Sequence, residues 1–96
     1  MKLSSLRAFI ATVEQGSMRA GARRLGLSQP ALSKMVREME GELATSLLAR
    51  STTGVVPTAQ GKVLYECACA TEREIVRAVD QIRQLSGSMV GELSIG

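Results

Sequence analysis

One short polar set has residue types and a spacing that suit recognition of a nucleic-acid duplex. Gln29, Ser33 and Arg37 are four residues apart, so on a helix they share one face, with Lys34 beside them. Glutamine can bond an adenine edge through two hydrogen bonds, arginine a guanine edge, and serine a base or a phosphate. The alternative is a solvated helix face, but residues 28–37 contain no acid, whereas a surface tuned only for solubility mixes the signs. The set predicts base readout in a major groove.

The helices that must carry this face are marked by their end signals. An apolar repeat at helical spacing starts at Leu3 and stops at Gly16, which suits the left-handed position just past a helix end. Ser17 then fits the N-cap of a second helix, which ends at Gly26. Ser28 fits the N-cap of a third helix shortly afterwards. These signals predict three helices in close succession.

The second and third helices are predicted to form a helix-turn-helix over about 18–37. Pro30 lies in the first turn of the third helix, where its missing N–H costs nothing, and that helix continues to about Leu43. The small Ala22 lies where the two helices come closest, and Gly26 permits the sharp turn. The residues expected to face inward are Met18, Ala22, Leu25, Leu32, Met35, Val36, Met39 and Leu43.

Residues 44–57 are predicted to form a small β-hairpin, because two short apolar runs flank a polar turn that contains a glycine. Arg50 at its base would point to a phosphate or into a minor groove, and Thr53 at its tip would approach the nucleic-acid backbone. The alternative for Arg50 is an ion pair with an acid of the third helix. Thr58 fits the N-cap of the next helix, where its hydroxyl and nearby N–H groups would seat a phosphate.

Residues 59–87 are predicted to form one long helix without a proline. Such a helix cannot bury its apolar stripe on a domain of about 60 residues, so it needs a partner, most simply a second copy of the chain. An intramolecular hairpin and a solvated spacer are the alternatives. The residues expected to form this dimer contact are Leu64, Ala68, Thr71, Ile75, Ala78, Ile82 and Leu85.

The composition agrees with a nucleic-acid partner for the first part of the chain. The 96 residues are 45% hydrophobic and 22% charged, with one Phe and one Tyr as the only aromatics, which favours one mainly helical domain with an aliphatic core. Residues 1–62 hold nine Lys/Arg and four Glu, a balance of +5. Residues 63–96 hold three Arg and five acids, a balance of −2. The basic half favours a polyanion.

Other function classes have little support in the sequence. It has no histidine and no base beside its two thiols, so we expect no enzyme, no metal site and no cofactor. Cys67 and Cys69 point to nearly opposite sides of a helix and are interpreted as packing residues in a reducing cytosol. Without a secretory signal or a stretch long enough to span a bilayer, we expect a cytoplasmic protein with no membrane partner.

The sequence resembles the LysR-type transcriptional regulators over nearly its whole length. The run Leu-Ser-Gln-Pro-Ala-Leu-Ser at residues 27–33 is among the more specific motifs of any helix-turn-helix family. The further residues that carry the resemblance are Gly16, Ser17, Ala22, Leu25, Glu40, Leu43, Leu47, Leu48, Arg50, Gly54, Thr58 and Gly61.

The resemblance implies a bacterial regulator that binds double-stranded promoter DNA at an interrupted dyad. It implies a mainly α fold, with a winged helix-turn-helix in residues 1–58 and a dimerisation helix in 59–87. It also implies a homodimer, a tetramer in the full-length protein, and a small-molecule effector that binds a C-terminal domain absent here. Residues 91–96 alternate like a strand, and residues 88–96 resemble the start of that domain. A coiled-coil adaptor that binds only proteins is the alternative.

The resemblance also implies which residues contact DNA. The recognition helix would offer Gln29, Ser33, Lys34 and Arg37, and the wing would offer Arg50 and Thr53; the predicted contact set further includes Ser28, Pro30 and Thr58. The chain departs from the family pattern at two positions. The wing usually has a basic residue where this chain has Thr53, which predicts a weaker grip on phosphate, and Leu48 replaces the usual Phe, which costs core volume.

Overall fold

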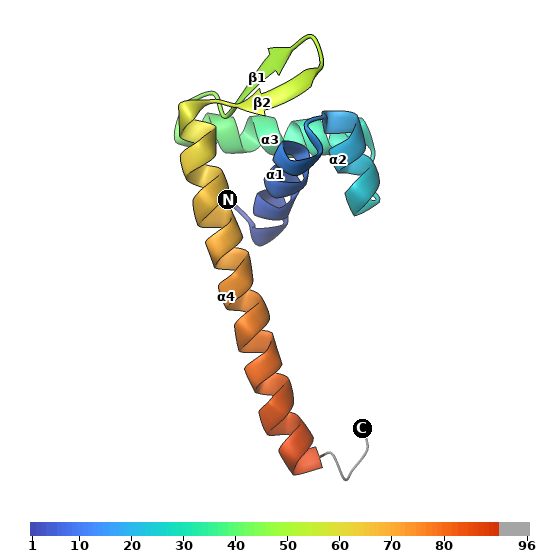
Figure 1. The fold of residues 1–96 in the computed structure, drawn as a ribbon, viewed down its shortest axis with the longest axis vertical. Coiled ribbons are helices and arrows are strands. Elements are labelled where there is room, and N and C mark those ends of the chain that lie inside the picture. Colours follow the sequence, from blue (N-terminus) through green and yellow to red (C-terminus); the bar gives the residue numbers. More distant parts are fainter. Residues whose placement is uncertain (91–96) are drawn as a thin grey trace.

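Four helices and one hairpin make up the computed structural model, which describes residues 1–90. The three N-terminal helices pack together, the hairpin projects beside them, and the last helix extends far beyond this head (Figure 1). The elements are α1 Leu3–Gln15, α2 Met18–Leu25, α3 Gln29–Leu43, β1 Leu48–Ser51, β2 Gly54–Pro57 and α4 Ala59–Val90. The expected mainly α fold with a winged helix-turn-helix and a long final helix is therefore confirmed.

The caps predicted from the sequence set the ends of the short helices. Gly16 closes α1 in the left-handed region at φ 68°, and its N–H reaches the carbonyls of the last turn. The hydroxyl of Ser17 accepts the N–H of Ala20 at 3.1 Å and so caps α2. The hydroxyl of Ser28 accepts the N–H of Ala31 at 3.2 Å and caps α3. Each cap satisfies backbone groups that the helix end would otherwise leave without a partner.

The core lies between α1 and the elements that surround it. One buried cluster joins Ala8 of α1, Ala22 of α2 and Leu32 of α3, and a second joins Phe9, Met39 and Leu47. Leu25 and Leu43, expected to face inward, are instead exposed, because each is the last residue of its helix and lies beyond the packed layer.

The closest approach of α1 and α2 is made by a residue that sequence reasoning overlooked. Gly21 is buried, and a Cβ at this position would lie 3.0 Å from the Cα of Thr12, closer than ordinary packing allows. Thr12 is also fully buried, and its hydroxyl donates a hydrogen bond of 2.8 Å to the Ala8 carbonyl. The helix-turn-helix is thus held against α1 by a backbone contact.

The first turns of α4 pack on α1, and the remainder extends away from the head. Ala68 is 1% exposed, and Leu64 packs on the Phe9 cluster. Both residues are predicted from the sequence to face a second copy of the chain. This prediction is wrong for Ala68, because its own chain already covers it. Leu64 is only partly covered by its own chain, so the prediction omits its contact with the core. The helix also continues to Val90, three residues past the predicted end. Residues 88–90, expected to begin a further domain, thus belong to α4, and the strand-like stretch predicted at residues 91–96 lies outside the described residues.

An exposed network ties three helices together. The Tyr65 hydroxyl of α4 donates to the Glu14 carboxylate of α1 at 2.8 Å, and Arg24 of α2 donates to the same carboxylate at 2.7 Å. The bond from Arg24, followed by that from Tyr65, lowers the pKa of Glu14 below its usual 4.5. The bond to Glu14 is also the main reason that the pKa of Tyr65 is raised to about 12.

This network predicts a pH dependence of stability. Because the pKa of Glu14 is lowered on folding, its contribution is complete above pH 4.5 and is lost as the pH falls through the lowered value. We expect Glu14→Gln to cost no more than about 1 kcal/mol near pH 7, since exposed pairs contribute little, and less near pH 3. Urea unfolding of both proteins at the two pH values measures this difference. A difference that stays constant with pH would contradict it.

Within residues 1–90, none of the helices combines the length and the apolar character required to cross a membrane.

Candidate nucleic-acid interface

The outward face of α3 and the hairpin together form one continuous surface. A hollow of about 390 Å³ lies between the start of α2, the start of α3 and the hairpin, and both Gln29 and Arg50 line it. A second hollow of about 230 Å³ follows along α3 and is lined by Ser33, Arg37 and again Arg50. The four-residue spacing seen in the sequence therefore places Gln29, Ser33 and Arg37 in a row facing the hairpin, and Arg50 links the two hollows.

The remaining predicted residues of α3 lie at the exposed start and centre of this face. Ser28, Pro30 and Lys34 are all exposed, and Lys34 follows Ser33 on the side of the helix farthest from the core. Among residues 1–90, Lys34, Arg37 and Arg50 form no ion pair with a protein acid. The positive charges of this surface are consequently available to an anion.

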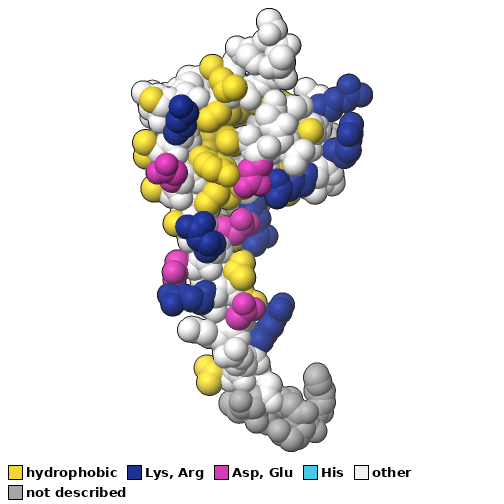
Figure 2. Space-filling view, viewed as in Figure 1, with side chains coloured by type: hydrophobic (Ala, Val, Ile, Leu, Met, Phe, Trp, Pro, Cys, Tyr) yellow, Lys and Arg dark blue, Asp and Glu magenta, His cyan; other side chains and the backbone are white. Residues whose placement is uncertain are grey.

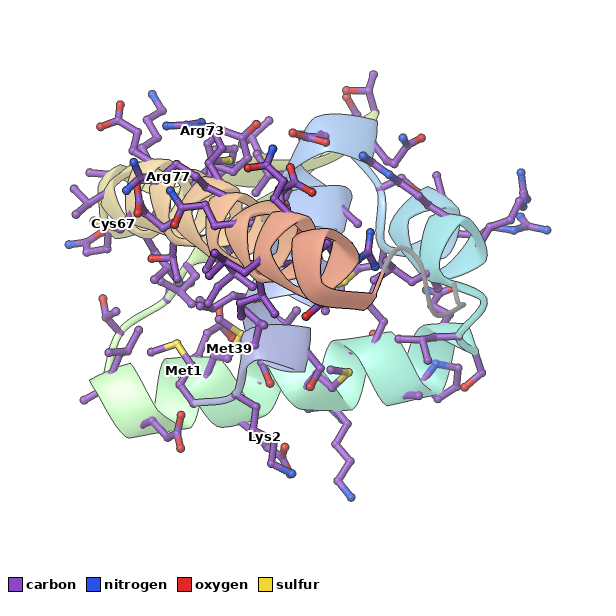
Figure 3. All side chains as sticks on the ribbon, turned by 90° about the horizontal axis from the view of Figure 1, so that it is seen from below. Met1, Lys2, Met39, Cys67, Arg73 and Arg77 are labelled. Carbon is purple, nitrogen blue, oxygen red and sulfur yellow. The ribbon has the colours of Figure 1, made fainter. Side chains whose placement is uncertain are left out.

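Two of the three acids of α3, Glu38 and Glu42, lie away from this face and line a hollow with the N-terminal residues, whereas Glu40 lines the second hollow beside Arg37 and Arg50. Glu42, on the opposite flank, forms an ion pair of 3.2 Å with the N-terminal amine of Met1. Figure 3 shows Met1 between α3 and α4. In Figure 2, Lys and Arg side chains gather over α2 at the edge of the head. Residues 28–37 therefore bring no acid to this face, and Glu40 is the acid of α3 that borders it.

Glu40 positions the hairpin, a role that sequence reasoning did not assign. Its carboxylate accepts the backbone N–H of Leu47 at 2.8 Å and that of Leu48 at 3.4 Å. This contact also answers the alternative for Arg50, because the acid of α3 nearest the hairpin binds backbone and not the guanidinium. Arg50 projects from β1, opposite Val55 of β2.

We expect Glu40→Ala to destabilise the fold by about 1–3 kcal/mol, because two N–H groups lose a charged acceptor. Chemical denaturation measures the change. Glu40→Gln keeps an oxygen acceptor, so its stability should lie between that of the unaltered chain and that of Glu40→Ala. Glu38→Ala is the matched control, since Glu38 is exposed on the same helix, and we expect it to change stability by less than about 0.5 kcal/mol. Equal effects of the Glu38 and Glu40 variants would contradict the positioning role.

The hairpin itself is docked on the turn between α1 and α2. Its strands are antiparallel, with Ser51 opposite Gly54. The N–H of Val55 donates to the Gly16 carbonyl at 3.0 Å. Gly54 has φ +142°, and a Cβ there would overlap the same carbonyl oxygen, so only glycine fits. Thr53 is exposed at the tip, as predicted, and its N–H bonds the Ser51 hydroxyl at 3.3 Å.

Thr58 has only one of the two roles predicted for it. It caps α4 as expected, because its hydroxyl accepts the N–H of Gly61 at 3.0 Å. The same hydroxyl donates to the carbonyl of Ser46 at 2.7 Å. A hydroxyl has a single proton, so none remains to donate to a phosphate. The prediction of a phosphate seat at this hydroxyl is wrong, and Thr58 instead joins the hairpin to α4.

A second candidate surface lies along α4, beyond the head. The part of the predicted dimer contact that remains exposed consists of Thr71, Ile75, Ala78, Ile82 and Leu85. Val76 and Val79 widen this apolar stripe and are exposed as well. Arg73 and Arg77 lie on the side of α4 away from α3 (Figure 3). A helix with several exposed large apolar side chains is typical of one that packs against a partner.

The two cysteines are free thiols and do not bridge each other. Cys67 is exposed and Cys69 is half-buried. Cys67 lines an apolar hollow between α1 and α4, together with Leu6 and Leu64.

Comparison with known proteins gives consistent matches to DNA-binding regulators. The chain is 38% identical over 96 residues to the nitrogen assimilation regulatory protein nac of Escherichia coli strain K12, covering 100% of this chain and 32% of that protein. The crystal structure of the CbnR DNA-binding domain with DNA has a TM-score of 0.82 and 35% identity, covering 90% of this chain and 99% of that one. The complex of the BenM DNA-binding domain with catB site 1 DNA has a TM-score of 0.86 and 31% identity, covering 90% and 96%.

The family model described as bacterial regulatory helix-turn-helix protein, lysR family, matches residues 3–62. This match contains α1, the helix-turn-helix and the hairpin, and it ends in the first turn of α4. Because the matched region is more than half of the 96 residues, the chain belongs to the LysR family of bacterial helix-turn-helix regulatory proteins.

Proposed function

We propose that this chain binds double-stranded promoter DNA in a sequence-specific manner, as the DNA-binding part of a bacterial transcriptional regulator. In this proposal α3 enters the major groove, and Gln29, Ser33 and Arg37 read base edges. Arg50 on the hairpin contacts the backbone or a minor groove, and Lys34 contacts a phosphate. The observation that carries the proposal is the row of Gln29, Ser33 and Arg37 facing the hairpin, with Arg50 between the two hollows.

The two related structures that contain DNA support this proposal, since they share 35% and 31% of their residues with this chain and nearly its whole fold. We further propose a homodimer formed through the exposed stripe of α4, which would place two recognition helices on an interrupted dyad. The division into a DNA-binding domain, residues 1–58, and a linker helix that begins at residue 59 belongs to the same proposal.

The chain spans 32% of the length of the relative nac. Response to a small effector and assembly into tetramers would therefore reside in a C-terminal domain of a longer protein. We propose no catalytic step for this chain, because its sequence has no histidine to act as a general base for either thiol. Promoter binding would place the protein in the bacterial cytoplasm, on the nucleoid.

Salt titration separates this function from a protein-binding adaptor. Fluorescence anisotropy with a duplex selected from a random pool, and with an unselected duplex, measures affinity at several salt concentrations. We expect tighter binding to the selected duplex. For each phosphate neutralised, log K should fall by about 0.9 per unit of log salt. Binding that is weak, equal for both duplexes and insensitive to salt would favour the adaptor.

A further inference from the structure

A hollow beside the hairpin brings together two arginines that are far apart in the sequence. It is lined by Arg19 of α2 and Arg50 of β1, with Ser17, Gln29 and Ser51 around them. Arg19 has no role in base readout, because it belongs to α2 and not to the row on α3. The hollow is nevertheless continuous with that row, since Gln29 of the row lines it and Arg50 lines both this hollow and the one that contains Ser33 and Arg37.

Neither arginine of this hollow has an anionic partner within residues 1–90. Arg24, on the same helix as Arg19, is by contrast held by Glu14 at 2.7 Å. Arg19 also lies in the first turn of α2, where the helix dipole disfavours a positive charge. Two like charges at one hollow raise each other's electrostatic energy, and an anion bound between them would relieve both.

Neutral donors surround the two guanidinium groups. The Ser17 hydroxyl caps α2 by accepting the N–H of Ala20, and its own proton is left to donate. The amide of Gln29 is exposed at the same hollow. Arginine forks with added hydroxyl and amide donors suit a phosphate with its several acceptor oxygens.

We infer that Arg19 and Arg50 together hold one backbone phosphate of the DNA, at the edge of the groove that α3 enters. This inference rests on the proposed function and adds a contact from α2 to it. The phosphate would lock the hairpin and the helix-turn-helix onto the same strand, because the two arginines come from these two parts of the domain. A phosphate contact positions the protein and carries no sequence information.

Binding of Arg19→Ala to selected and unselected duplexes tests the inference. We expect the affinity for both to fall about tenfold, with the preference between them unchanged. The dependence of log K on log salt should become shallower by less than about 0.9, because Arg50 still contacts the phosphate. Arg19→Lys should recover part of the affinity. In the double variant with Arg50→Ala the slope should fall by about one phosphate and not two, since both arginines would hold the same phosphate.

Arg23→Ala is the matched control, because Arg23 is exposed on the same helix one turn away and does not line the hollow. We expect it to keep affinity within about twofold, since a solvated arginine that contacts no phosphate adds little. The melting temperature of Arg19→Ala should be unchanged or slightly raised, because an unfavourable positive charge is removed from the first turn of α2.

Two results would overturn the inference while leaving the proposed function intact. One is normal salt-dependent binding by the unaltered chain with no effect of Arg19→Ala. The other is an equal effect of Arg19→Ala and Arg23→Ala. A change in base preference, or a slope that falls by two phosphates in the double variant, would likewise contradict a shared phosphate. If the unaltered chain itself binds no duplex, the proposed function fails together with this inference.

Discussion

Arg37→Ala is expected to weaken binding to a selected duplex by about 1–3 kcal/mol and to blur the preference at one base pair. Arg37 is exposed on α3, lines the hollow between α3 and the hairpin, and has no acidic partner within residues 1–90. Its guanidinium is thus unpaired at the place where a base edge would lie. An arginine that bonds a guanine edge with two parallel hydrogen bonds discriminates by this amount.

The specificity of this effect is measured by binding to a set of duplexes that differ at single positions. Arg73→Ala removes the same charge from the side of α4 away from α3 (Figure 3), and we expect it to leave the base preference unchanged. Folding should be preserved in both variants, because both side chains are exposed. If Arg37→Ala weakened every duplex equally, Arg37 would be a phosphate contact, and its assignment to base readout would be wrong.

Ile75→Lys is expected to make the free energy of dimerisation about 3–5 kcal/mol less favourable and so to dissociate the proposed dimer. This is the cost of an uncompensated charge in a buried contact. Ile75 is 39% exposed in the single chain and lies at the centre of the apolar stripe of α4. Because Ile75 belongs to neither buried cluster of the head, we expect the variant and the unaltered chain, compared as monomers, to unfold at nearly the same denaturant concentration. Sedimentation velocity over a range of concentrations measures the dissociation.

Asp80→Asn is the matched control for Ile75→Lys, since it raises the net charge by the same one unit. Asp80 is five residues further along α4, so its side chain points about 140° away around the helix. We expect this variant to dimerise like the unaltered chain. An intact dimer in Ile75→Lys would show that the contact between copies does not use this stripe.

Local signals were enough to predict the helix-turn-helix. The caps at Ser17 and Ser28 and the helix end at Gly16 depend on hydrogen bonds that span three or four residues. The row on α3 depends only on helical periodicity, which a spacing of four residues reveals. The local sequence is therefore sufficient to predict the positions of the three helices and the polar face of the third.

Contacts between distant residues were outside the reach of these signals. Glu40 binds backbone N–H groups beyond the end of its own helix, and Tyr65 reaches Glu14 across 51 positions of the chain. The stripe of α4 reads as one continuous pattern, yet its first part is covered by α1, so Ala68 belongs to the intramolecular core. Periodicity states that a face is apolar and does not state which surface covers it.

The proximity of Arg19 and Arg50 likewise depends on packing between elements that are distant in the sequence. Each arginine looks like an ordinary exposed cation in the sequence, and they are brought to one hollow when the hairpin docks on the turn between α1 and α2. Order along the chain sets helix ends and faces, because hydrogen-bonded turns join near neighbours. Packing of separate elements sets which faces remain free, because that depends on shape and buried area across the whole domain.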